Sequence, residues 1–195
     1  MGRWISFLLL VTGLIFVSVN SYQIFAAKSK HSDSLQVAQK IILESEGKGS
    51  EELIEDGILE DIEPELGEII GIISIPSLND EWAIVEGTRE EDLDVGVGHY
   101  FGTAYPAQGK QVFLAGHRDT VFSELNEITE GDIIEIQMSY GTFQYEVSEM
   151  FIVDAEDRTV IDYSTDEEVL TLCTCYPFRY VGPAPDRYII NATPL

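Results

Sequence analysis

The sequence predicts a mainly β fold, a closed barrel or a sandwich, that follows an apolar amino-terminal helix. Short segments rich in β-branched residues recur from about residue 68 to the carboxy terminus. The helical patterns between them are few and short, and many short strands with few helices are typical of barrels and sandwiches. Hydrophobic residues make up 45 % of the chain, which is enough for a packed core.

The first 27 residues, 1–27, predict a transmembrane helix that anchors the chain in a membrane. No charged residue occurs from Trp4 to Ala27. A helix of about 24 residues extends roughly 36 Å, which exceeds the hydrocarbon core of a bilayer, about 30 Å. The alternative is a cleaved secretory signal, which requires small residues before the cut, and cleavage after Ala27 puts Phe25 at position −3. We therefore expect an uncleaved anchor.

Residues 28–67 predict an acidic tether that is partly helical. Leu35, Ala38 and Ile41 recur at helical spacing, so a short helix is expected there. From residue 51 to residue 68 every charged residue is acidic, and apolar residues recur at every fourth position. That stretch is either an acidic amphipathic helix packed on the domain or a solvated spacer.

Residues 68–195 form the predicted β domain. Its clearest signal is a hairpin, because apolar and polar residues alternate on both sides of a turn at Ser139 to Gly141. Short helices are expected around residues 90–93 and 121–128. The predicted strands cover residues 69–75, 82–85, 110–114, 134–138, 143–147, 151–153, 169–175 and 187–191.

The composition excludes several classes of function. The net charge of −24 opposes binding to phosphate backbones, so nucleic acid is not an expected partner. Two cysteines are too few for a disulfide framework, and the three histidines show no zinc-ligand spacing beside them. We therefore expect neither a metal nor another cofactor.

Both cysteines lie in one predicted strand, where Cys173 and Cys175 point to the same face. Pro177 cannot donate to a sheet ladder, so the strand is expected to end near Cys175. That position opens into a loop and makes Cys175 a candidate nucleophile. Cys173 lies deeper and is interpreted as a small core residue.

A thiol that attacks an amide needs a base and a group that stabilises the oxyanion. His117 follows a predicted strand and Gly116, which is a plausible place to display a catalytic imidazole, whereas His99 is interpreted as structural. Arg187 opens the last predicted strand. If that strand pairs with the strand of Cys175, the two side chains come together; the alternative for Arg187 is a surface ion pair with Asp186 or another acid.

These residues together resemble the sortases, membrane-anchored cysteine transpeptidases of Gram-positive bacteria. The stretch from Thr171 to Cys175 matches the family motif TLxTC in full, and His117 and Arg187 are correctly placed around it. The resemblance runs from about Glu68 to the carboxy terminus. The Tyr-Pro-Phe that follows Cys175, with the proline-rich segment before Arg187, is most similar to class D sortases of bacilli.

The resemblance implies an eight-stranded β-barrel and a role for each matching residue. Cys175 is then the nucleophile, His117 the general acid/base and Arg187 the oxyanion stabiliser, and Thr174 helps to bind the substrate. Sortases cleave an LPxTG-like sorting signal after its threonine through a thioester, and class D members tend to prefer LPxTA. They transfer the surface protein to an amine of a peptidoglycan precursor.

The implied partners are surface proteins that carry an LPxT-type signal, the cell-wall amine and the membrane. The implied location is the cell membrane, with a single span and an extracellular catalytic domain. Two alternatives remain open at this point. One is a cysteine endopeptidase of the same fold that only hydrolyses, and the other is a non-enzymatic acidic wall-associated module.

Overall fold

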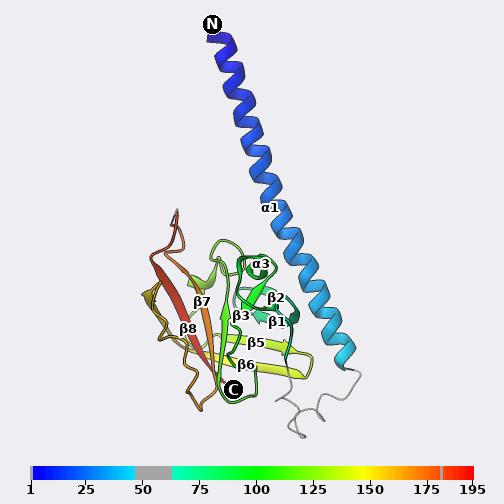
Figure 1. Ribbon diagram of the computed structural model, residues 1–195, viewed down its shortest axis with the longest axis vertical. Coiled ribbons are helices and arrows are strands. Elements are labelled where there is room, and N and C mark those ends of the chain that lie inside the picture. The colour runs from blue at the N-terminus through cyan, green and yellow to red at the C-terminus, as the bar shows by residue number, and fades with distance from the viewer. Residues whose placement is uncertain (1, 47–62, 181) are drawn as a thin grey trace.

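The computed structural model describes residues 2–46, 63–180 and 182–195. Eight strands close into a barrel in the order β1-β2-β3-β4-β7-β8-β6-β5 (Figure 1). The strands are β1 (Ile69–Ile75), β2 (Asp80–Glu86), β3 (Val97–His99), β4 (Gln111–Ala115), β5 (Ile133–Met138), β6 (Gly141–Asp154), β7 (Val169–Tyr176) and β8 (Asp186–Pro194). The predicted mainly β, eight-stranded barrel is confirmed.

The alternation of apolar and polar residues produces the barrel core. In β5 the side chains of Ile134, Ile136 and Met138 are buried, whereas their polar neighbours are partly exposed. The hairpin predicted here is present, because Met138 pairs with Gly141 across a two-residue turn. The second arm, β6, continues without a break through residues 151–153, which the sequence analysis treated as a separate strand.

Two elements differ from the prediction. β3 is not among the predicted strands, but its three residues pair with β2, and Gly98 and His99 also pair with β4. The helix predicted over 121–128 is only a 3₁₀ turn, η2 (Leu125–Glu127), preceded by turns. The short helix expected at 90–93 is present as α3 (Glu90–Leu93). An element as short as β3 cannot be predicted from periodicity, because three residues are too few to show a repeat.

Two strand pairs in the barrel are parallel, β2 with β3 and β4 with β7, and the others are antiparallel. β7 therefore has β4 on one side and β8 on the other. This arrangement joins three segments that are far apart in the sequence. It decides which loops meet at the carboxyl end of β7.

One helix, α1 (Gly2–Glu46), covers both the predicted anchor and the helical part of the tether. Its last third packs against the outside of β1 and β2, where Ala38 and Ile42 contact Ile72 and Ala83. The remainder extends away from the barrel (Figure 1). The short helix predicted around residue 38 is thus part of a much longer one.

Polar contacts also attach α1 to the domain. The Ser34 hydroxyl donates to the Val95 carbonyl at 2.7 Å, and the His31 ring lies 3.0 Å from the same oxygen. Within the described ranges, no helix is both long and apolar enough to cross a membrane, so the predicted transmembrane helix is not confirmed. The acidic stretch predicted over 51–68 falls mostly outside the described residues.

Candidate active site

The parallel pair β4 and β7 brings His117 to the end of β7. Ala115 lies opposite Cys173, and the Gly116 N–H donates to the Cys173 carbonyl at 3.0 Å. The pairing ends at Ala115, and His117 follows two residues later, in the turn after β4. On the other side of β7, Cys175 lies directly opposite Arg187 of β8. Cys175 and Arg187 therefore face each other on paired strands, and His117 follows the strand on the opposite side of β7.

The two cysteines are both free and half-buried. Burial raises the pKa of the Cys173 thiol to about 11, although the guanidinium groups of Arg187 and Arg158 act in the opposite direction. Cys173 is therefore protonated near neutral pH, and a protonated thiol is a poor nucleophile. Both arginines lie close enough to act on the Cys173 thiol.

His117 sits in a tight turn that directly follows β4. Its backbone carbonyl accepts hydrogen bonds from the N–H groups of Thr120 at 3.3 Å and Phe122 at 3.0 Å. Gly116 permits this turn, because a Cβ at that position would lie 2.6 Å from the ring of the buried Phe122. No hydrogen bond joins the His117 ring to Cys175 in the described part of the chain. Such bonds are often long before substrate binds.

Thr174 is 2 % exposed, and its hydroxyl donates to the Gly116 carbonyl at 2.7 Å. Because side chains alternate along a strand, Thr174 points to the face opposite Cys175. In this structure its hydroxyl attaches β7 to the residue before His117. Its predicted contact with substrate stays a prediction.

Arg187 donates to backbone carbonyls of its own loop rather than to a carboxylate. Its guanidinium lies 2.9 Å from the Asp186 carbonyl and 3.4 Å from the Ala184 carbonyl. The alternative of an ion pair with the Asp186 side chain is absent among the described residues. The guanidinium retains further N–H groups for a ligand, because an arginine carries five.

Arg118 was not predicted to be a functional residue, and its side chain is 8 % exposed. Its guanidinium donates to three backbone carbonyls of the β7–β8 loop, those of Pro177 at 2.9 Å, Tyr180 at 2.8 Å and Gly182 at 3.2 Å. The only indication of a role in the sequence was its position next to His117. Its carbonyl partners could not be predicted, because they lie about sixty residues further along the chain.

His99 is a buried structural residue, as expected. Its Nδ1 lies 2.8 Å from a carboxylate oxygen of Glu86, and its Nε2 lies 3.0 Å from the Ala104 carbonyl. The hydroxyl of Tyr105 donates to the same Glu86 oxygen at 3.0 Å. This buried cluster fixes the loop after β3 and takes no part in the site at the end of β7.

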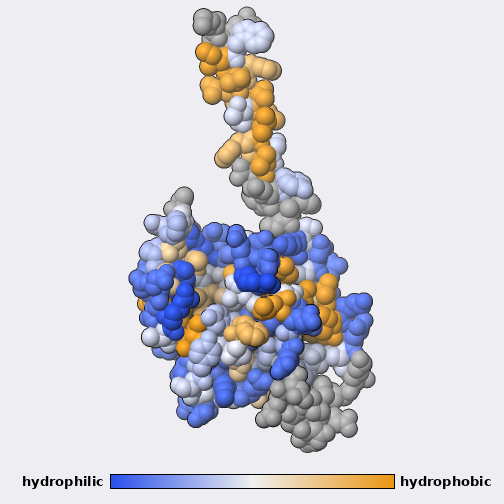
Figure 2. Space-filling model, viewed as in Figure 1, coloured by the Kyte–Doolittle hydropathy of each residue, from blue (hydrophilic) through white to orange (hydrophobic). Residues whose placement is uncertain are grey.

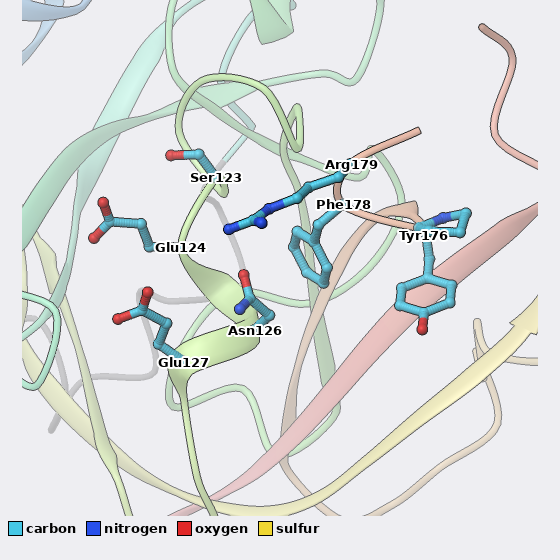
Figure 3. A pocket seen from close by; sticks show the side chains of 8 residues that line it. Ser123, Glu124, Asn126, Glu127, Tyr176, Phe178 and Arg179 are labelled. Atoms are coloured by element: carbon cyan, nitrogen blue, oxygen red, sulfur yellow. The ribbon is translucent and has the colours of Figure 1, made fainter. Parts of the chain in front are cut away.

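A pocket of about 560 Å³ opens where the chain continues from Cys175 and from His117. One wall comes from residues 176–179 and the other from residues 123–127. Figure 3 shows the Arg179 side chain reaching toward the segment that carries Ser123 and Asn126, while the Tyr176 ring points away. The pocket therefore follows Cys175 along the chain and has polar side chains available, although Cys175, His117 and Arg187 do not line it.

Comparisons with known proteins agree with this geometry. Residues 73–195 match the family model described as "Sortase domain". The chain is 39 % identical over 194 residues to Sortase D of Bacillus subtilis (strain 168), and the match covers 97 % of each protein.

Two solved structures extend the similarity to the fold. A Clostridium perfringens Sortase D5 transpeptidase is 27 % identical, with a TM-score of 0.70 over 86 % of this chain and 99 % of that one. The catalytic domain of B. anthracis SrtD is 39 % identical, with a TM-score of 0.58 over 69 % of this chain and 92 % of that one. The barrel, the arrangement of His117, Cys175 and Arg187 around β7, and these matches lead to one conclusion. The chain belongs to the sortase family and is a cysteine transpeptidase, most similar to class D.

Proposed function

We propose that this sortase cleaves an LPxTG- or LPxTA-like sorting signal after its threonine and transfers the surface protein to an amine of the cell wall. The observation that carries the proposal is the pairing of Cys175 with Arg187 across β7 and β8, with His117 just after β4 on the other side of β7. The non-enzymatic alternative is set aside, because the chain is a cysteine transpeptidase. Pure hydrolysis differs only in the second step.

In the first step Cys175 gives its proton to His117, and the sulfur attacks the threonine carbonyl carbon. A C–S bond forms, and the oxyanion develops near the guanidinium of Arg187, which can donate to it. The C–N bond then breaks, and His117 gives the proton to the departing amine. The enzyme now carries the surface protein as a thioester.

In the second step a neutral amine of the cell wall attacks the thioester carbonyl carbon. A new C–N bond forms while the amine loses a proton to His117. The C–S bond breaks, and the sulfur of Cys175 recovers the proton from His117. Nothing is oxidised or reduced, so the residues present are sufficient for both steps.

Membrane attachment through residues 1–27, with the catalytic domain outside the cell, is part of the proposal. What supports it is the charge-free run of the sequence and its exposed apolar side chains, among them Trp4, Phe7 and Leu14. Figure 2 shows hydrophobic residues along the part of α1 that stands clear of the domain. Such a surface is costly to leave in water. Cell fractionation of the full chain and of a chain without residues 1–27 tests this attachment.

Peptide products test the chemistry. The full chain is incubated with LPxTA and LPxTG peptides, with and without an amine acceptor, and the products are identified by mass. We expect a transfer product only with acceptor, and no cleavage by the Cys175→Ala or His117→Ala variant. Hydrolysis as the sole outcome at saturating acceptor would identify an endopeptidase. Cleavage by the Cys175→Ala variant would refute the assigned nucleophile.

A further inference from the structure

Arg118 links the turn after β4 to the loop after β7 through hydrogen bonds. The transpeptidation steps proposed above do not use these bonds. It follows His117, and its guanidinium donates to three carbonyls of the loop that follows Cys175. Its guanidinium carbon also lies 5.9 Å from the centre of the Tyr180 ring, within the range of a cation–π contact. The side chain is 8 % exposed, so these contacts form in a largely dry environment.

The β7–β8 loop is held at its start by Phe178, which packs against the core and against Tyr188, and beyond that by Arg118. Among the described residues, no other side chain donates a hydrogen bond to the carbonyls of residues 177–182. The hydrogen bonds from Arg118 therefore fix the positions of carbonyls on both sides of the loop. A planar guanidinium with a fixed set of donors can satisfy several at once and thereby restrict the loop to one arrangement.

This loop forms one wall of the 560 Å³ pocket that follows Cys175 along the chain. Pro177, whose carbonyl Arg118 binds, lines the pocket, together with its neighbours on either side. The opposite wall, residues 123–127, lies on the segment that continues from Arg118 itself. Arg118 therefore ties the loop of one wall to the start of the segment that forms the other.

We propose that Arg118 is a positioning residue that holds this pocket in the shape that admits the acceptor amine, and that it thereby favours transfer over hydrolysis. The inference rests on the proposed function. The thioester on Cys175 has two competing fates. An amine nitrogen forms the C–N bond, or a water oxygen forms a C–O bond, and in both cases the C–S bond breaks and His117 relays the proton.

The two fates respond differently to the shape of the pocket. An amine carried on a large cell-wall precursor must be held in one orientation to react, whereas water is small and abundant. Loss of a fixed wall therefore costs the amine its alignment and admits more water. Formation of the thioester takes place on the strands themselves and depends less on this wall.

The test compares Arg118→Met, which has a similar length and no donor, with Arg118→Lys, which keeps the charge and part of the donor set. Each full-length variant receives sorting peptide and an amine acceptor, and the ratio of transferred to hydrolysed product is measured over a range of acceptor concentrations. Both products arise from the same acyl-enzyme. The ratio is therefore independent of how much of the variant is folded.

We expect Arg118→Met to lower the ratio about tenfold and to raise the KM for the amine, since small misplacements of a reacting group cost that much or more. Arg118→Lys should give an intermediate ratio. The matched control is Arg89→Met, which removes an arginine that caps α3 through Asp92, remote from β7. It should lower stability and leave the ratio unchanged.

Two results would overturn the inference: an unchanged ratio in both Arg118 variants, or an equal fall in Arg89→Met. A failure of the proposed function looks different, because the wild-type chain would then give no cleavage or no transfer at all.

Discussion

Cys175 and Arg187 occupy directly opposite positions in the antiparallel ladder of β7 and β8. Opposite residues in such a ladder have Cβ atoms about 4.5–5.5 Å apart and share one face. Arg187 also acts electrostatically on Cys173, which lies one pleat away on that face. Arg187 is therefore on the same face as the Cys175 thiol, as its proposed role in stabilising an oxyanion requires.

The first prediction follows from this pairing. Arg187→Lys keeps the charge but loses the planar donor set, and Arg187→Gln loses the charge as well. We expect kcat/KM for the sorting peptide to fall about 10²–10³-fold in Arg187→Gln and somewhat less in Arg187→Lys. Peptide cleavage is the measurement. Arg89→Lys, far from β7, serves as the control, and near-normal kcat/KM in Arg187→Gln would remove Arg187 from the mechanism.

The second prediction concerns the pH dependence of the two thiols. Burial raises the pKa of Cys173 to about 11, so at pH 8 about one molecule in a thousand carries it as thiolate. Only the thiolate is alkylated, and reactivity therefore increases as the pH approaches 11. In the Cys175→Ala variant, iodoacetamide should leave Cys173 unlabelled at pH 8 and label it progressively above pH 10.

Mass spectrometry of the alkylated protein measures this directly. The same variant unfolded in denaturant is the control and should be labelled readily at pH 8, because its thiol is exposed. Equal labelling rates in the folded and unfolded states at pH 8 would show that Cys173 is not protected by burial.

The third prediction concerns the bond from Thr174 to Gly116. Thr174→Val has nearly the same shape, but it leaves the buried Gly116 carbonyl without this donor, which costs about 1–3 kcal/mol. Gly116 cannot adjust freely, because it packs against Phe122, so the turn that presents His117 should also shift. We expect a lower Tm together with a lower kcat.

Thr174→Ser is the matched variant, since it restores the hydroxyl but not the methyl group. It should recover most of the activity while it stays slightly less stable than the wild type. If Thr174→Val is less stable but fully active, the bond only supports the fold. If both variants lose peptide affinity to the same extent, the contact is made to the substrate instead.

Local patterns in the sequence were sufficient for most of the strands. The alternation around Ile134 and Ile136 predicted the hairpin, and the β-branched run before Pro76 predicted β1, because a half-buried strand repeats every two residues. β3 was missed because it is three residues long and includes a glycine. The helix predicted over 121–128 is reduced to a 3₁₀ turn; here the barrel packing of Val121 and Phe122 outweighs local propensity.

The sequence by itself determined which residues are candidates for the chemistry, since the TLxTC motif, His117 and Arg187 are recognisable along the chain. Only the tertiary structure decided how they meet. The parallel pairing of β4 with β7 joins Gly116 to Thr174 across 58 positions, and the Arg118 contacts span 59 to 64 positions. No short-range pattern encodes such contacts, because they form only when the barrel closes and carbonyls of one loop come within reach of a donor from another.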